Sequence, residues 1–115
     1  MSDSGLPELD VARVRRWAER QVPAEHLDRV RVECQLAPRH LTIVERTPPW
    51  QDAAEAEWII QPVARLRYTK MNRRWTLYWP DRNSRFHIYQ QLDPSPRVAD
   101  LLAEIDADPT AIFWG

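Results

Sequence analysis

The stretch RWTLYWPDRNSRFHIYQ, residues 74–90, restricts the fold of this chain more than any other part of the sequence. Large apolar side chains recur at every second position on both sides of its middle, at Trp75, Leu77, Trp79, Phe86 and Ile88. This period of two predicts two strands, each with an apolar and a polar face. Between them, Pro80 lacks a backbone N–H and Asp81 readily bonds to nearby backbone, so a turn is expected. The segment therefore predicts a β-hairpin.

Three further segments have the composition of strands. Residues 30–36 alternate between apolar and polar side chains, residues 41–46 resume an extended pattern after a break, and residues 58–69 form a longer run. Pro62 near the start of that run suits an edge strand or a bulge. The connection at 47–57 begins with two prolines and is interpreted as a loop. Since the other connections are short, we expect sequential strands to be neighbours in a five-stranded antiparallel meander.

Two segments outside the strands have the period of amphipathic helices. The first runs from about Pro7 to Gln21, and the second ends near Asp106. Their apolar stripes consist of Val11, Val14, Ala18 and Val22 in the first, and of Val98, Leu101, Leu102 and Ile105 in the second. The predicted fold class is α+β: an N-terminal helix, the five-stranded antiparallel β-meander and a C-terminal helix, with both helices on one sheet face.

Matching the apolar positions of neighbouring strands predicts a register with four-residue loops. The expected apolar pairs are Tyr68 with Trp75, Leu66 with Leu77, Trp79 with Phe86, and Leu77 with Ile88. The same register predicts two polar rows, Arg65 with Tyr78 and His87, and Arg67 with Thr76 and Tyr89. We also expect Phe113 and Trp114 at the C-terminal end to dock against the helices or the sheet edge, because exposed aromatic side chains favour aggregation. Trp50 and Trp58 are interpreted as partly buried caps over the rim of the core.

Length and composition limit the class of protein. A chain of 115 residues has the usual size of one domain, so residues 1–115 are expected to fold as a unit. No apolar run approaches the roughly 18 residues of a membrane span, and the polar N-terminus has no secretory signal, so a cytoplasmic protein without a membrane partner is expected. The single cysteine, Cys34, excludes an internal disulfide. His26, His40 and His87 fall on separate predicted elements, so neither a metal site nor a cofactor is predicted.

Four runs carry a resemblance to a known family: ERTPPW at 45–50, ARLRYT at 64–69, WTLYWPDRN at 75–83 and LLAEIDADPTAIFWG at 101–115. They resemble the uncharacterised bacterial family called domain of unknown function 3024. The similarity covers most of the chain and is most specific around 75–83 and in the closing Phe-Trp-Gly. Because the family has no assigned function, the resemblance implies no catalytic residue.

The charge pattern suggests a binding surface. Residues 63–90 carry seven positive side chains and one acid, whereas the whole chain has a net charge of −1. Arginine offers a planar fork of donors to phosphates, and aromatic rings stack on bases. We therefore predict a non-catalytic binding module for an anionic ligand such as nucleic acid. The predicted ligand-binding residues are Arg65, Arg67, Arg74, Tyr78, Arg85, His87 and Tyr89.

Two alternatives use the same face. Tyrosine and arginine are enriched in the energetic centres of protein interfaces, so a homodimer through this face is the first alternative. The second is a metal-independent RNA-cleaving enzyme, with His87 as general acid, Arg65 and Arg67 as phosphate clamps and Glu33 as base. That set rests on analogy with small α+β ribonucleases, and binding is preferred over catalysis.

Overall fold

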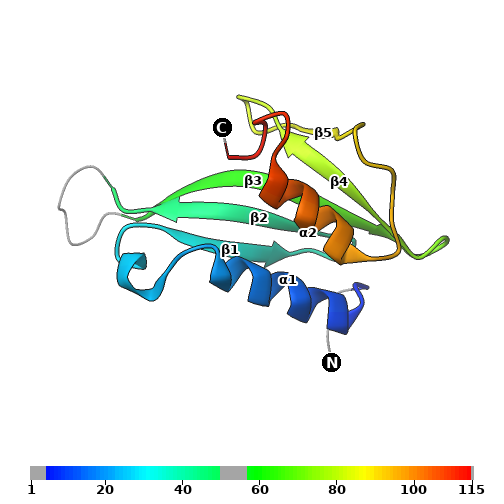
Figure 1. Cartoon of the computed structure of the whole chain (residues 1–115), viewed down its shortest axis with the longest axis horizontal. Coiled ribbons are helices and arrows are strands. Elements are labelled where there is room, and N and C mark those ends of the chain that lie inside the picture. The colour runs from blue at the N-terminus through cyan, green and yellow to red at the C-terminus, as the bar shows by residue number, and fades with distance from the viewer. Residues whose placement is uncertain (1–4, 50–56, 115) are drawn as a thin grey trace.

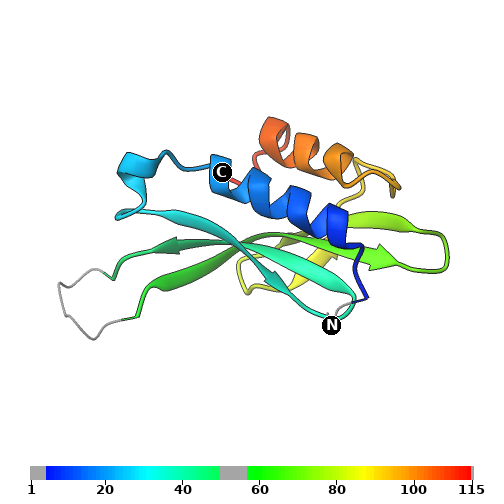
Figure 2. The same ribbon diagram turned by 90° about the horizontal axis from the view of Figure 1, so that it is seen from below.

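A computed structural model describes residues 5–49 and 57–114. Its elements, in order, are α1 (Glu8–Arg20), the 3₁₀ turn η1 (Ala24–His26), β1 (Arg31–Leu36), β2 (His40–Thr47), β3 (Ile59–Thr69), β4 (Arg74–Pro80), β5 (Phe86–Ile88) and α2 (Val98–Ala107). The strands form one antiparallel sheet in the order β1-β2-β3-β4-β5. Both helices lie on the same side of it (Figures 1 and 2). The predicted α+β meander is therefore confirmed, and within the described ranges no helix is long and apolar enough to cross a membrane.

The helix ends follow local chemistry. α1 begins after Pro7, whose φ of −60° suits the residue before a helix, and two acids lie in its first turn, where negative charge is favourable. Pro23 follows three residues after its end and cannot continue the helical hydrogen bonding. α2 stops at Asp108, which adopts the left-handed conformation (φ 41°). Its carboxylate accepts hydrogen bonds from the N–H groups of Phe113 and Trp114, so the same residue that ends the helix also folds the tail back.

The core lies between the helices and the sheet surface beneath them, which we call the helix face. Most of the deeply buried apolar side chains of the sheet lie there: Leu41, Ile43, Ala64, Leu66, Trp75 and Leu77. From the helices they meet Val14, Trp17, Leu101 and Ile105. A hydrogen bond also joins the sheet to α1, because Trp75 Nε1 donates to the Asp10 carboxylate at 2.9 Å. Burying these groups supplies most of the free energy that holds the layers together.

The predicted register is right for one hairpin and wrong by one residue for the next. Between β3 and β4 the partners are Leu66 with Leu77, Tyr68 with Trp75, Arg65 with Tyr78 and Arg67 with Thr76, as expected. Between β4 and β5, however, Trp79 faces His87 and Tyr78 faces Ile88. The expected pairs of Trp79 with Phe86 and of Leu77 with Ile88 do not form.

The turn between β4 and β5 explains this shift. Asp81 N donates to Arg85 O, Ser84 N donates to Asp81 O, and Ser84 has a φ of 61°. This is a three-residue loop in which a left-handed residue follows a tight turn, not the four-residue loop predicted. An odd change in loop length exchanges the two faces of the strand that follows.

The side chains of β5 therefore face opposite to the prediction. Tyr89, expected on the exposed polar face, is 0% exposed, and its hydroxyl donates to Glu104 at 2.6 Å. Ile88, expected in the core, is 54% exposed, and Phe86 is only partly buried. Both lie on the sheet surface away from the helices, which we call the open face. The prediction that five alternating residues of this hairpin fill the core is thus correct for Trp75 and Leu77 only, with Trp79 partly buried against it.

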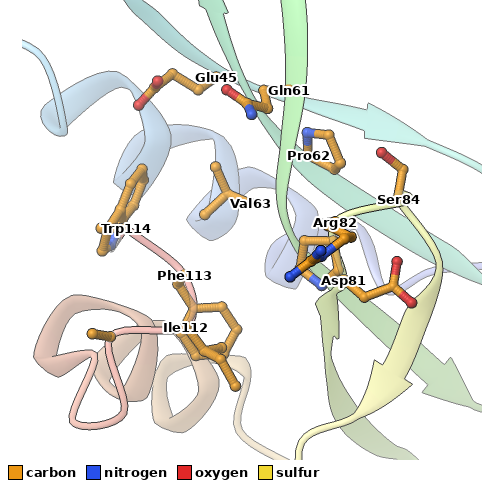
Figure 3. Close-up of a pocket in the computed structure, with 12 residues that line it drawn as sticks. Glu45, Gln61, Pro62, Val63, Asp81, Arg82, Ser84, Ile112, Phe113 and Trp114 are labelled. Atoms are coloured by element: carbon orange, nitrogen blue, oxygen red, sulfur yellow. The ribbon is translucent and has the colours of Figure 1, made fainter.

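A bulge interrupts the pairing of β2 and β3. The register shifts between Ile43 and Val44, and Pro62, which has no N–H to donate, lies beside this shift. Proline is tolerated at such irregular positions of a sheet. Beyond the bulge Glu45 pairs with Gln61, and both follow the helix-face alternation of β2. Figure 3 shows Glu45, Gln61 and Val63 beside the C-terminal tail. The bulge thus re-aims the first part of β3 toward the tail.

The tail docks as predicted. Phe113 is buried with its ring 5.1 Å from that of Tyr89. Trp114 lies 6.4 Å from Trp17, ring to ring, and its Nε1 donates to Ile105 O. Trp58 is partly buried, as expected of a cap, whereas Trp50 and most of the connection at 47–57 lie outside the described residues.

Candidate functional site

The open face gathers positive charge from four strands. No described helix covers it (Figure 2). Its cross-strand pairing and alternation assign to it five arginines, namely Arg31, Arg46, Arg65, Arg67 and Arg74. Glu33 is the acid that pairing places among them. Arg74 also donates to Pro94 O at 3.4 Å at the edge of this surface. The arginines predicted on β3 and β4 therefore share one face, and arginines of β1 and β2 extend it beyond the strands considered in the prediction.

Arg65 is held in place at the centre of this face. Its Nε donates to Thr42 Oγ1 at 3.0 Å, and its guanidinium lies 3.9 Å from the centre of the Phe86 ring. Burial lowers the pKa of Arg65 from its usual 12.5, although it stays cationic at neutral pH. Among the described residues no acceptor bonds to its Nη1 or Nη2. The guanidinium is thus oriented by neighbours while two of its nitrogens remain available.

Two further cationic or basic groups lie beside Arg65. His40 pairs with Arg67 across β2 and β3, two positions from the Thr42–Arg65 pair and on the same face. Burial and then the charges of Arg65 and Arg67 lower the pKa of His40, which favours its neutral form. Within the described part of the chain, Arg67 has no ion-pair partner. An anion arriving here would meet two neighbouring arginines, and its own charge would favour protonation of His40 beside them.

At the other end of the open face, one arginine forms an ion pair and another stacks on an aromatic ring. Arg46 Nη1 lies 3.2 Å from Glu33 Oε2, and Arg31 lies over the Trp58 ring at 4.6 Å. Glu33 is therefore engaged with an arginine on the neighbouring strand. Arg65 and Arg67, by contrast, form no ion pair with a described residue.

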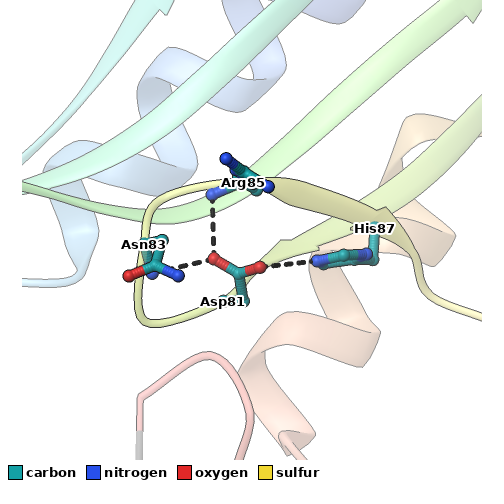
Figure 4. Close-up of polar contacts among 4 residues, drawn as sticks. All are labelled: Asp81, Asn83, Arg85 and His87. Atoms are coloured by element: carbon teal, nitrogen blue, oxygen red, sulfur yellow. Dashed lines mark hydrogen bonds and ion pairs between the residues drawn. The ribbon is translucent and has the colours of Figure 1, made fainter.

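His87 belongs to a different environment. It pairs with Trp79 and therefore shares the helix-face alternation, with its ring 4.8 Å from that of Trp79. Its Nε2 lies 2.8 Å from Asp81 Oδ2, while Asp81 Oδ1 accepts the N–H groups of Asn83 and Arg85 (Figure 4). The bond to His87, followed by those backbone bonds, lowers the pKa of Asp81 to about 2. These contacts close the β4–β5 turn.

The predicted site residues divide accordingly. Arg65, Arg67, Arg74 and Tyr78 share the open face. The predicted placement of Tyr89 on that face is wrong because Tyr89 is in the core, and that of His87 is wrong because the turn places it on the other side. Arg85 is exposed beside the turn, where Asp81 binds its backbone.

The catalytic set predicted for RNA cleavage does not assemble. Glu33 is bonded to Arg46 on the open face, and His87 is bonded to Asp81 on the opposite side of the sheet. A general acid and a base must both reach the same substrate atoms. His87, Glu33 and the two arginines therefore do not form one site.

Sequence reasoning missed several residues of the face. His40, Thr42, Arg46, Phe86 and Arg31 contribute to it, as the contacts above show. The alternation in 30–36 and 41–46 contained a signal, because Arg31, Glu33, Thr42 and Arg46 fall on the polar side of those strands. For Phe86 the signal was misleading, since an apolar residue was assigned to the core. No group of three or more His, Cys, Asp or Glu side chains suited to a metal ion occurs in residues 5–49 and 57–114.

Comparisons with known proteins assign no activity to this site. No curated protein and no solved structure matches the chain. The sequence model of one family matches residues 2–115, which is nearly the whole chain. The chain therefore belongs to the family described as Domain of unknown function (DUF3024).

Proposed function

We propose that the open face binds an anionic ligand without catalysing a reaction, and that single-stranded nucleic acid is the first candidate. The observation that carries the proposal is the Arg65 guanidinium, held between the Phe86 ring and the Thr42 hydroxyl with its terminal nitrogens free of described partners. A donor oriented before binding loses less conformational entropy when the ligand arrives. Arg65 is therefore a prepared anion contact.

The neighbouring side chains extend this contact along the sheet. Arg67 lies two residues further along β3, about 7 Å away at the usual rise of a strand. Tyr78 is the cross-strand partner of Arg65 and adds an aromatic ring with a hydroxyl. Rings and guanidinium planes can both stack on bases, whose faces are accessible in single strands. A flexible single strand can follow such a row of side chains, with its bases accessible to the ring and the guanidinium planes.

Fluorescence anisotropy with a labelled oligothymidylate tests this proposal. The variant Arg65→Gln/Arg67→Gln should bind more weakly than the wild type, and its log affinity should depend less steeply on log salt. Losing two phosphate contacts changes that slope by about 1.4 for a single strand. The matched control is Arg13→Gln/Arg16→Gln, which removes the same charge from exposed positions of α1.

The control variant distinguishes a specific binding site on the open face from nonspecific attraction of the oligonucleotide to the protein's positive charge. If both double variants weaken binding equally, net charge explains the affinity and the open face is not the site. If the wild type does not bind the oligonucleotide at low salt, the nucleic-acid proposal is wrong. Circular dichroism of each variant establishes that the fold is retained. RNA should be recovered intact after incubation with the wild type, since a cleaved product that disappears in His87→Ala would indicate an enzyme instead.

A second candidate function is self-association through the same face. Ile60 and Ile88 follow its alternation and are 48% and 54% exposed, which favours an apolar contact between two copies. Light scattering distinguishes the two functions. A dimer that becomes monomeric in Ile60→Ser/Ile88→Ser, together with no oligonucleotide binding, would favour association over anion binding.

A further inference from the structure

A groove of about 410 Å³ lies between α1 and α2. The two helices pack against each other on one side of the sheet (Figures 1 and 2). Side chains of these two helices line the groove, so it is separate from the arginines of the open face, and the proposed function does not depend on it. The lining includes Arg13, Arg16 and Arg20 from α1 and Ala99, Leu102 and Ala103 from α2.

The floor of the groove is apolar and held in place. Leu102 is 5% exposed and belongs to the core, and Ala99 and Ala103 lie one turn apart beside it on α2. Because an alanine side chain ends at its methyl group, this flank of α2 leaves room for another side chain. Trp17 Nε1 donates to both carboxylate oxygens of Asp106, at 3.1 and 3.0 Å, which ties α1 to α2. The groove is therefore formed before any partner binds.

The α1 side of the groove is positively charged. Arg13, Arg16 and Arg20, which we call the α1 arginines, follow the spacing i, i+3, i+7 and so extend along one side of α1 over about 10 Å. All three are exposed, and none forms an ion pair with a described residue. Asp106 also lines the groove, but its carboxylate accepts the Trp17 N–H. Three cations and one acid leave the groove with an excess of positive charge.

The other acids of the last helix do not offset this charge. Asp100 accepts the Ser95 hydroxyl and forms an ion pair with Arg97, and Glu104 accepts the Tyr89 hydroxyl. A symmetric dimer through this helix pair would place the α1 arginines of one copy near those of the other. Charge complementarity therefore favours a different molecule, with unpaired acids, as the occupant.

We propose that this groove binds an acidic amphipathic helix of a partner protein. Amphipathic helices commonly bind by laying their apolar face into an apolar groove. Apolar side chains of the partner helix, three or four residues apart, pack on Leu102 between Ala99 and Ala103. Its aspartate and glutamate side chains, repeated at helical spacing along one flank, meet the α1 arginines.

The floor distinguishes a protein partner from nucleic acid. Single-stranded nucleic acid binds where its bases stack on accessible aromatic rings. Trp17, the aromatic residue of this lining, is 9% exposed, and its N–H is engaged with Asp106. The alanines and Leu102 offer aliphatic surface, which suits leucine-like side chains better than bases.

Fluorescence anisotropy with a designed, labelled helical peptide of about five turns tests the proposal. The peptide has leucine at every third or fourth position and glutamate along one adjoining flank, and a second peptide has glutamine in place of each glutamate. The acidic peptide should bind the wild type, and the glutamine peptide should bind more weakly. Arg13→Gln/Arg16→Gln should weaken binding of the acidic peptide about fivefold, because exposed ion pairs are individually weak.

A matched control tests whether position or total charge matters. Arg29→Gln/Arg82→Gln removes the same charge from exposed positions outside the groove and should leave peptide binding unchanged. If this control and the Arg13→Gln/Arg16→Gln variant lose equal affinity, the groove is not the site. If Arg65→Gln/Arg67→Gln weakens peptide binding instead, the peptide binds the open face and the proposal is wrong.

Substitutions on α2 test the apolar floor. Ala103→Gln places a longer side chain in the groove without changing the charge and should weaken binding of the acidic peptide by a similar factor. Ala107→Gln, at an exposed position one turn further along α2 and outside the lining, should have no effect. Circular dichroism of each variant establishes that the fold is retained.

Three further results would contradict a groove for an acidic helix. These are the absence of acidic-peptide binding to the wild type, equal affinity for the acidic and glutamine peptides, and equal losses in Ala103→Gln and Ala107→Gln. Unlabelled oligothymidylate should not displace the peptide, since displacement would mean that the groove takes nucleic acid. Failure of the oligonucleotide experiment on the open face leaves this proposal unaffected, because the two sites share no residue.

Discussion

The two faces of the sheet exclude water in different ways. Over the helix face, α1 and α2 supply separate apolar layers, and Leu41, Leu66 and Trp75 are fully buried beneath them. No described helix lies over the open face, yet Thr42 and Val44 are 6% and 2% exposed there. Thr42 is covered by a side chain of the sheet itself, since Arg65 bonds to its hydroxyl.

This difference has a functional consequence. On the helix face, the groups that stabilise the fold are not available to a ligand. On the open face, one arginine both covers the sheet with its aliphatic stem and presents charge to solvent, as long cationic side chains can. We therefore expect substitutions on the open face to affect stability modestly and binding strongly, and those on the helix face to affect mainly stability.

The largest expected difference in stability is between substitutions at two adjacent residues of the chain, Tyr89 and Ile88. Tyr89→Ala should lower the free energy of unfolding by about 3–5 kcal/mol, because a fully buried aromatic side chain is removed. Ile88→Ala should change it by no more than about 0.5 kcal/mol, as is usual for exposed positions. Urea unfolding measures both values. A large loss for Ile88→Ala and a small one for Tyr89→Ala would mean that the two faces of β5 are exchanged.

A smaller effect is expected from Thr42, which is buried on the open face. Thr42→Val keeps the shape but removes the acceptor for Arg65 Nε, so unfolding free energy should fall by about 1 kcal/mol. Thr69→Val, at an exposed position of β3, is the control. Oligonucleotide affinity should also fall in Thr42→Val, because Arg65 loses its orientation. If Thr42→Val lowers the free energy of unfolding by the same amount in an Arg65→Lys background, loss of the bond to Arg65 Nε does not explain the destabilisation.

The smallest effect concerns acid stability at the β4–β5 turn. The pKa of Asp81 is lowered to about 2 in the folded protein, so its charged form favours folding. That contribution is complete above the ordinary aspartate pKa near 4 and is lost as the pH falls toward about 2. The melting temperature of the wild type should therefore fall more between pH 4 and pH 2 than that of Asp81→Asn. An NMR titration of the Asp81 carboxyl with a midpoint near 4 would contradict this prediction.

Much of the architecture follows from local sequence patterns. Both helices and all five strands were predictable from apolar periodicity. The β3–β4 register was predictable too, because the apolar positions of the two strands match only with a loop of even length, and the loop between Thr69 and Arg74 is even. The charge concentrated at Arg65 and Arg67 was also visible, since polar positions of a strand share a face once the register is known. The extension of the face to His40 and Thr42 required the pairing of β2 with β3.

Tertiary structure decided the rest. The run Phe86-His87-Ile88-Tyr89 offers two alternations of nearly equal quality, with either Phe86 and Ile88 or His87 and Tyr89 on one face. The left-handed Ser84 makes the loop odd, and the bond from Tyr89 to Glu104 on α2, distant in sequence, stabilises the second choice. The same holds for the bulge at Val63, which turns Gln61 toward a tail folded against it. Apolar periodicity shows which residues share a face, but loop parity and long-range contacts determine which face is buried, because a shift of one residue leaves the local pattern almost unchanged.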